Sequence, residues 1–166
     1  MTPKTKQALD KLASYFYLQI EYASDLHDNV PGFLQPGPDP RYIVVNARKP
    51  ACDQALTIAH ELAHYVLHPE GKPARFLPRY LDPLRQFQPM EQWAQATERF
   101  TRQKFNIEWQ ADLWAFILLW QIGAVDELLD LIQLYPGKTR MFWYSWAAVV
   151  YANVKQRITA LFSSRI

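Results

Sequence analysis

Apolar residues recur every three or four positions along several stretches of this chain, which is the spacing of a helix with one buried face. The first such stretch covers residues 4–18. An alternating segment, LQIEYA at 18–23, and a β-branched run, RYIVVNA at 41–47, each predict a strand. Between them, DNVPGFLQPGPDP at 28–40 holds four prolines and predicts a loop.

Helical spacing dominates the rest of the chain. We expect a helix from Asp53, as its N-cap, to His68, followed by a proline-rich irregular connection over 69–89. Further helices are expected over 90–123, over 125–135 and from Thr139 onward. A few strands followed by a run of helices predict an α+β fold with a small sheet near the N-terminus.

Length and composition favour one folded domain over residues 1–166. A chain of 166 residues with 49% hydrophobic residues can bury one proper core, whereas two separate domains would each be marginal. The net charge of +2 comes from basic and acidic residues scattered without a block of one sign. No direct binding to nucleic acid or to an anionic membrane surface is therefore expected.

Two observations bear on location. The chain has a single cysteine, Cys52, which cannot form an internal disulfide and is expected to be buried. The most apolar segments, 113–120 and 141–154, are shorter than the roughly 20 residues that a membrane-spanning helix needs. With no secretory signal in the polar N-terminal segment, we expect a cytoplasmic protein.

The chemistry is concentrated in TIAHELAHYVLH at 57–68, which holds three of the four histidines. His60, Glu61 and His64 form an H-E-x-x-H motif on a predicted helix. Histidines four residues apart lie about 6 Å apart along the helix axis, so both can reach one metal ion. Glu61 lies about 100° around the helix from His60, where it can take a proton from water without binding the metal. The motif predicts a zinc site with Glu61 as the general base.

A hydrolytic zinc site needs a third protein ligand. His68 lies about 12 Å along the axis from His60, too far to share the ion, and we expect it to be solvent-exposed near the helix end. The better candidate is Glu108, which lies four residues before Asp112 on a helix that is turning apolar. We expect Glu108 to bind the metal and Asp112 to orient a ligand histidine by accepting its distal N–H.

These segments together resemble the ImmA/IrrE family of zincin-like metallopeptidases. The resemblance rests on TIAHELAHYVLH and on EWQADLWAFILL some forty residues later, and it covers roughly residues 8–120. It implies a zinc-dependent peptidase fold with His60, His64 and Glu108 as ligands and Glu61 as base. It also implies a protein or peptide substrate, such as a DNA-binding transcriptional repressor. Residues 121–166 form a helical extension outside the resemblance.

The chain departs from the family pattern in two places. Ala63 stands where the H-E-L-G-H core usually has glycine, and Trp120 and Gln121 replace a Met-Pro pair. The second departure bears on the shape of the substrate groove, and therefore on the substrate.

Several alternatives stay open from the sequence. The aromatic residues of the last helix are expected to be core, with a protein-binding face as the alternative. Candidates for stabilising the oxyanion are Tyr65, Arg79, Tyr80 and Tyr144. Besides a peptidase, the chain fits a catalytically idle domain that binds a regulator, or an interaction module whose motif is accidental.

Overall fold

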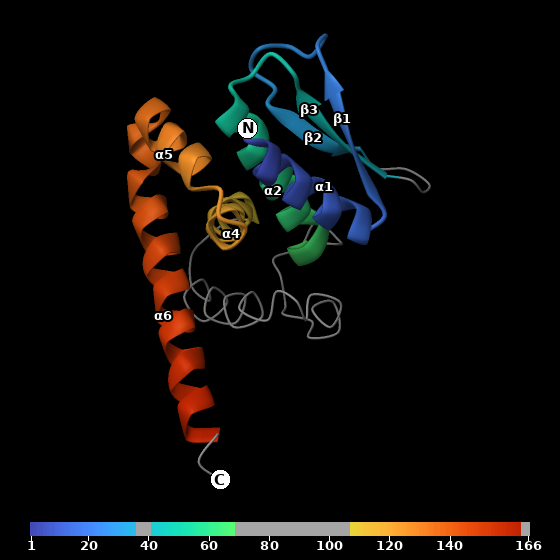
Figure 1. Cartoon of the computed structure of the whole chain (residues 1–166). Helices are drawn as coiled ribbons and strands as arrows, with labels where there is room; N and C mark the ends of the chain where they lie inside the picture. Colours follow the sequence, from blue (N-terminus) through green and yellow to red (C-terminus); the bar gives the residue numbers. More distant parts are fainter. Residues whose placement is uncertain (36–40, 69–106, 164–166) are drawn as a thin grey trace.

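A small mixed sheet and two helices packed against it form the N-terminal half of the molecule, and helices form the rest (Figure 1). The structure is a computed structural model that describes residues 1–35, 41–68 and 107–163. The elements, in order, are α1 (Pro3–Tyr15), β1 (Leu18–Ala23), β2 (Gly32–Gln35), β3 (Arg41–Asn46), α2 (Ala51–Leu67), α4 (Ile107–Gln121), α5 (Val125–Leu134), the 3-10 turn η3 (Pro136–Lys138) and α6 (Thr139–Ser163). This arrangement confirms the predicted α+β class.

The central strand of the sheet is β3, which is parallel to β1 and antiparallel to β2. Its residues Ile43, Val44 and Val45 are all buried, so both faces of the strand are covered. A continuous β-branched run suits such a position, because neither face meets water. The helix α2 packs against β2 and β3, and α1 packs against β1 and α2. The sheet therefore supports the helix that carries the H-E-x-x-H motif.

The edge strand β2 corrects the sequence prediction. Residues 28–40 were expected to be loop, but Gly32–Gln35 pair with β3, with Leu34 opposite Ile43. The prolines of this segment suggested a loop, but they flank the four-residue strand and do not interrupt it. Pro31 even contributes its carbonyl, which accepts a hydrogen bond of 2.9 Å from the Asn46 N–H.

Most predicted helices are confirmed, with one correction at the start of α2. Pro50 occupies the N-cap without a side-chain hydrogen bond, so Asp53 is not the cap that we expected. Asp53 is buried inside the first turn and accepts a 2.6 Å hydrogen bond from the Tyr135 hydroxyl. The expected connection over 69–89 and the predicted helical residues 90–106 lie outside the described residues.

The long helix α6 departs from its expected burial. Phe142 is buried and packs against Trp120 of α4, but Trp143, Trp146 and Tyr151 are 55%, 42% and 66% exposed. Tyr144 is also 42% exposed, so the prediction that Trp143, Tyr144, Trp146 and Tyr151 are core is wrong. In the part of the chain that the structure describes, no helix has the length and apolarity needed to cross a bilayer.

The close approach of β2 to its neighbours makes Gly32→Ala a test of the sheet. A Cβ at residue 32 would lie 2.4 Å from the Val44 carbonyl oxygen and 2.6 Å from Thr57 Cγ2. We expect the substitution to lower the free energy of unfolding by about 2 kcal/mol, since backbone cannot yield as a flexible side chain can. Denaturant unfolding measures the loss. Gly137→Ala is the control, because a Cβ there meets nothing within 4 Å, and equal stabilities for the two variants would contradict this packing.

The hydrogen bond between Tyr135 and Asp53 fastens the end of α5 to the start of α2, and Tyr135→Phe tests it. We expect a loss of about 1–2 kcal/mol in the free energy of unfolding at neutral pH, since the acceptor is charged. The bond to Asp53, with burial, raises the pKa of Tyr135 to about 12.

This direction fixes the pH dependence. In the unfolded chain the Tyr135 hydroxyl ionises near pH 10. The bond therefore contributes fully to the free energy of unfolding below that pH, and this contribution is lost as the pH rises toward 12. The difference in unfolding free energy between wild type and Tyr135→Phe, measured from pH 8 upward, should shrink over this window. A difference that stays constant to pH 12 would rule out the assigned bond.

Candidate metal centre

The helix α2 places the two histidines of the motif on one face. His60 and His64 are one helical turn apart, and their side chains are 18% and 20% exposed. Their Nε2 atoms lie 2.9 Å apart, so both rings direct the same nitrogen to one point. The residues of α2 that face the core are buried, whereas the two histidines are partly exposed.

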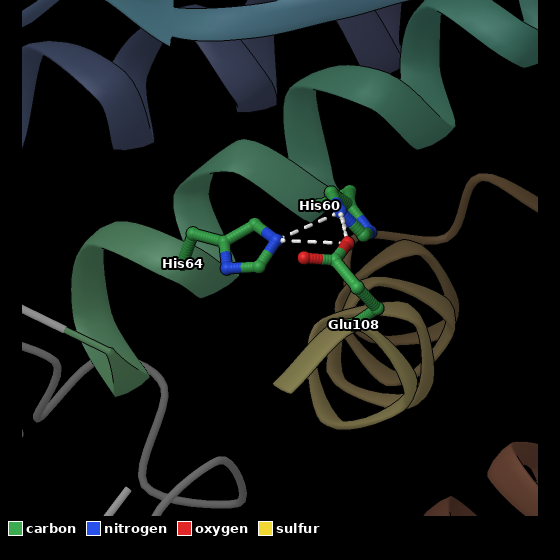
Figure 2. Close-up of side chains that lie close together, drawn as sticks. All are labelled: His60, His64 and Glu108. Atoms are coloured by element: carbon green, nitrogen blue, oxygen red, sulfur yellow. Dashed lines mark hydrogen bonds and ion pairs between the residues drawn. The ribbon is translucent and has the colours of Figure 1, made fainter. Parts of the chain in front are cut away.

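Glu108 reaches the same point from the first turn of α4 (Figure 2). Its Oε2 lies 3.2 Å from Nε2 of His60 and 3.4 Å from Nε2 of His64. The Glu108 side chain is 66% exposed, so the point where the three atoms meet is open to solvent on one side. The sequence predicted these three residues as ligands, and the structure brings all three together.

The donor set fits a zinc ion. Three lone-pair atoms that face one another at this distance repel unless a cation or a proton lies between them. Tetrahedral zinc with bonds of about 2.0–2.1 Å holds its ligand atoms about 3.3 Å apart, which is close to the spacing found here. Among the described residues, no second group of histidine, cysteine or carboxylate side chains gathers in this way.

The far nitrogen of His60 is held by Asp112, as expected from the sequence. His60 Nδ1 donates to Asp112 Oδ1 at 2.9 Å, and Lys138 Nζ contacts Asp112 Oδ2 at 3.1 Å. Burial opposes charge on Asp112, but the bond from His60 and the Lys138 ammonium outweigh it and keep its pKa below the usual value. Burial also opposes charge on His60, yet Asp112 and the nearby glutamates keep its pKa above the usual value. Asp112 is therefore a carboxylate that fixes the proton of His60 on Nδ1.

His68 corrects another expectation. It was expected to be exposed, but it is only 5% exposed and contacts Gln110 of α4. Its Nε2 lies 2.9 Å from Oε1 of Gln110, and its Nδ1 lies 3.2 Å from Nδ1 of His64. Burial lowers the pKa of His68, so the ring is neutral at physiological pH. His68 thus lies behind His64, on the side away from Glu108.

Glu61 lies between the histidines and the edge of the sheet. The Leu34 N–H of β2 donates to its Oε2 at 3.0 Å. Burial raises the pKa of the Glu61 carboxyl, while His60 and His64 are near enough for their charges to oppose this. A partly desolvated carboxylate beside a cation site is a suitable proton acceptor.

Sequence reasoning missed three residues around this centre: Lys138, Gln110 and the role of His68. Lys138 comes from the 3-10 turn, and no spacing in the sequence connects it with Asp112. The i,i+4 continuation from His64 to His68 was a usable signal, because it places both rings on one face.

The proposed oxyanion candidates separate into two groups. Two are described: the Tyr65 ring packs against the Phe16 ring and has the Arg41 guanidinium above it. The Tyr144 hydroxyl accepts hydrogen bonds from Arg140. Arg79 and Tyr80 lie outside the described residues.

The two departures from the family pattern have structural explanations. Ala63 is fully buried in α2, where helix geometry does not need a glycine. Trp120 stands where a Met-Pro pair is usual, and here α4 continues through it. Its ring packs against Phe142, and its Nε1 donates to Ser145 Oγ at 3.1 Å, so it anchors α6.

Comparison with known proteins agrees with this geometry. Residues 13–119 match the Peptidase M78 family, described as the IrrE N-terminal-like domain. No curated protein and no solved structure matches significantly. The match covers more than half of the chain and includes the H-E-x-x-H helix and the helix that carries Glu108 and Asp112. The chain therefore belongs to the Peptidase M78 family of IrrE N-terminal-like domains, a family of metallopeptidase type.

Proposed function

We propose that this protein is a zinc-dependent peptidase that hydrolyses a peptide bond in a protein substrate. The observation that carries the proposal is the meeting of His60, His64 and Glu108 at one point beside the Glu61 carboxylate. Two histidines and a glutamate leave one position of a tetrahedral ion for solvent or substrate, which distinguishes a catalytic zinc site from a closed structural one.

Each residue of the site has a separate role in the proposed hydrolysis. His60, His64 and Glu108 would hold zinc, which when bound polarises the scissile carbonyl and makes a neighbouring water more acidic. Glu61 accepts a proton from the attacking water and delivers it to the leaving amine. Asp112 and Lys138 keep the proton of His60 on Nδ1, so that Nε2 stays free to bind the ion.

The substrate in this proposal binds as an extended peptide along β2. In the described sheet, β2 pairs with β3 on one side only. The Leu34 N–H points to the other side, toward Glu61, so the open edge of the strand adjoins the candidate centre. Strand addition at such an edge recognises backbone and suits a protein substrate.

A DNA-binding transcriptional repressor is the substrate that we propose, on the resemblance to the ImmA/IrrE family. The reaction would take place in the cytoplasm, where a DNA-binding repressor is located. A single buried cysteine, which needs no oxidising compartment, is compatible with this location.

Glu61→Gln tests the chemistry. We expect the variant to bind zinc like wild type and to lose peptidase activity by roughly 10²–10⁴-fold, because the amide cannot accept the proton. Activity is measured as cleavage of a repressor encoded beside this protein's gene, with the new termini identified by mass spectrometry. Zinc is measured in the same preparations.

The outcomes separate the alternatives. A repressor that stays intact with the zinc-loaded wild type would remove it as the substrate. A Glu61→Gln variant that keeps both zinc and full biological activity would favour a catalytically idle domain that acts by binding. A wild type without stoichiometric zinc would leave only an interaction module.

Asp112→Ala tests the support of His60. Without the carboxylate, His60 loses the acceptor for Nδ1–H, and we expect zinc affinity to fall about 10–100-fold. Competition with a chromophoric chelator measures it. Asp130→Ala removes an exposed aspartate from α5 and should leave the affinity unchanged. Equal affinities for the two variants would show that Asp112 does not orient the ligand.

A further inference from the structure

The two nitrogens of the His64 ring face different partners. Nε2 faces His60 and Glu108, at 2.9 Å and 3.4 Å, and Nδ1 lies 3.2 Å from Nδ1 of His68. A neutral imidazole carries its proton on one nitrogen and a lone pair on the other. His64 can bind a metal through Nε2 only if its proton is on Nδ1, so whatever contacts Nδ1 decides whether the ligand is ready.

His68 and Gln110 supply that contact from buried positions. They are 5% and 8% exposed, so water does not readily replace their partners. The Gln110 Oε1, 2.9 Å from His68 Nε2, only accepts hydrogen bonds, so the bond needs a proton on Nε2 of His68. His68 Nδ1 then presents a lone pair to His64.

With the oxygen of Gln110 toward His68, all of these hydrogen bonds form with one set of proton positions. His68 Nε2–H donates to the Gln110 oxygen, His64 Nδ1–H donates to His68 Nδ1, and Nε2 of His64 is left with its lone pair toward Glu108. With the Gln110 amide reversed, every proton would move to the opposite nitrogen, and Nε2 of His64 would carry a proton that blocks ligation.

We propose that His68 and Gln110 are positioning residues that hold His64 in its metal-binding tautomer, an inference that rests on the proposed zinc site. The two ligand histidines are thus oriented in different ways. A carboxylate and a lysine hold His60, whereas a buried imidazole and an amide hold His64.

Paired variants test this role. His68→Phe keeps an aromatic ring but removes the acceptor, whereas His68→Asn keeps an oxygen near the position of Nδ1. Gln110→Leu removes the acceptor for His68, and Gln110→Glu keeps one. We expect zinc affinity to fall about 10–100-fold in the Phe and Leu variants and to stay near the wild-type value in the Asn and Glu variants. Gln121→Leu, on the same helix at its far end, is the control and should bind zinc like wild type.

A second measurement does not depend on activity or on the folding of a variant. In zinc-loaded wild type labelled with ¹⁵N-histidine, NMR should find the proton of His64 on Nδ1 and that of His68 on Nε2. It should also detect a coupling across the hydrogen bond between the two Nδ1 atoms. A proton on Nδ1 of His68 would overturn the proposal.

The remaining outcomes are distinguishable. A folded His68→Phe that binds zinc as tightly as wild type overturns the positioning role and leaves the zinc site intact. A wild type that takes up no zinc overturns the proposed function, and the role of His68 falls with it. If His68→Phe does not fold, the Gln110 pair and the NMR of the wild type decide.

Discussion

The packing of α4 against α2 is the constraint on which the rest of the centre depends. Both helices present small buried side chains in the shared core: Ala55, Ala59 and Ala63 on α2, and Ala111 and Ala115 on α4. Small side chains let two helices approach closely. Asp112 meets His60, and Glu108 meets both His60 and His64. Two residue pairs with i,i+4 spacing therefore meet face to face, and that match creates the point where three ligand atoms converge.

The segment after the family match also contributes to the centre. Lys138 contacts Asp112, and Tyr135 contacts Asp53 at the start of α2. Trp120, at the end of α4, holds α6 through Phe142 and Ser145. A single domain over residues 1–166 stays a prediction, but these contacts support it, because an extension unrelated to the site would not supply a cation to it.

The sequence was sufficient for features that depend on local spacing. His60, Glu61 and His64 follow from helix geometry, and Glu108 with Asp112 follows from carboxylates on a helix that becomes apolar. The central strand β3 was predictable because a short run of β-branched and aromatic residues favours a strand. In each case the signal lies within a few residues along the chain.

What the sequence could not predict depends on contacts between distant segments. Strand β2 is defined by its pairing with β3, and no pattern within its four residues shows that. His68 was expected to be exposed because Gln110, which its ring contacts, is 42 residues away in the sequence. The aromatic residues of α6 looked like core by composition, yet burial depends on which side of the helix meets α4.

The most direct test of the centre is zinc X-ray absorption on the purified protein. Two imidazole nitrogens at about 2.0–2.1 Å and light oxygen ligands, with no sulfur, are expected, together with about one zinc per chain. In His64→Ala, the zinc X-ray absorption spectrum should show one imidazole ligand fewer than in wild type. A zinc–sulfur distance of about 2.3 Å, or an unchanged set of zinc ligands in His64→Ala, would contradict a centre made of His60, His64 and Glu108.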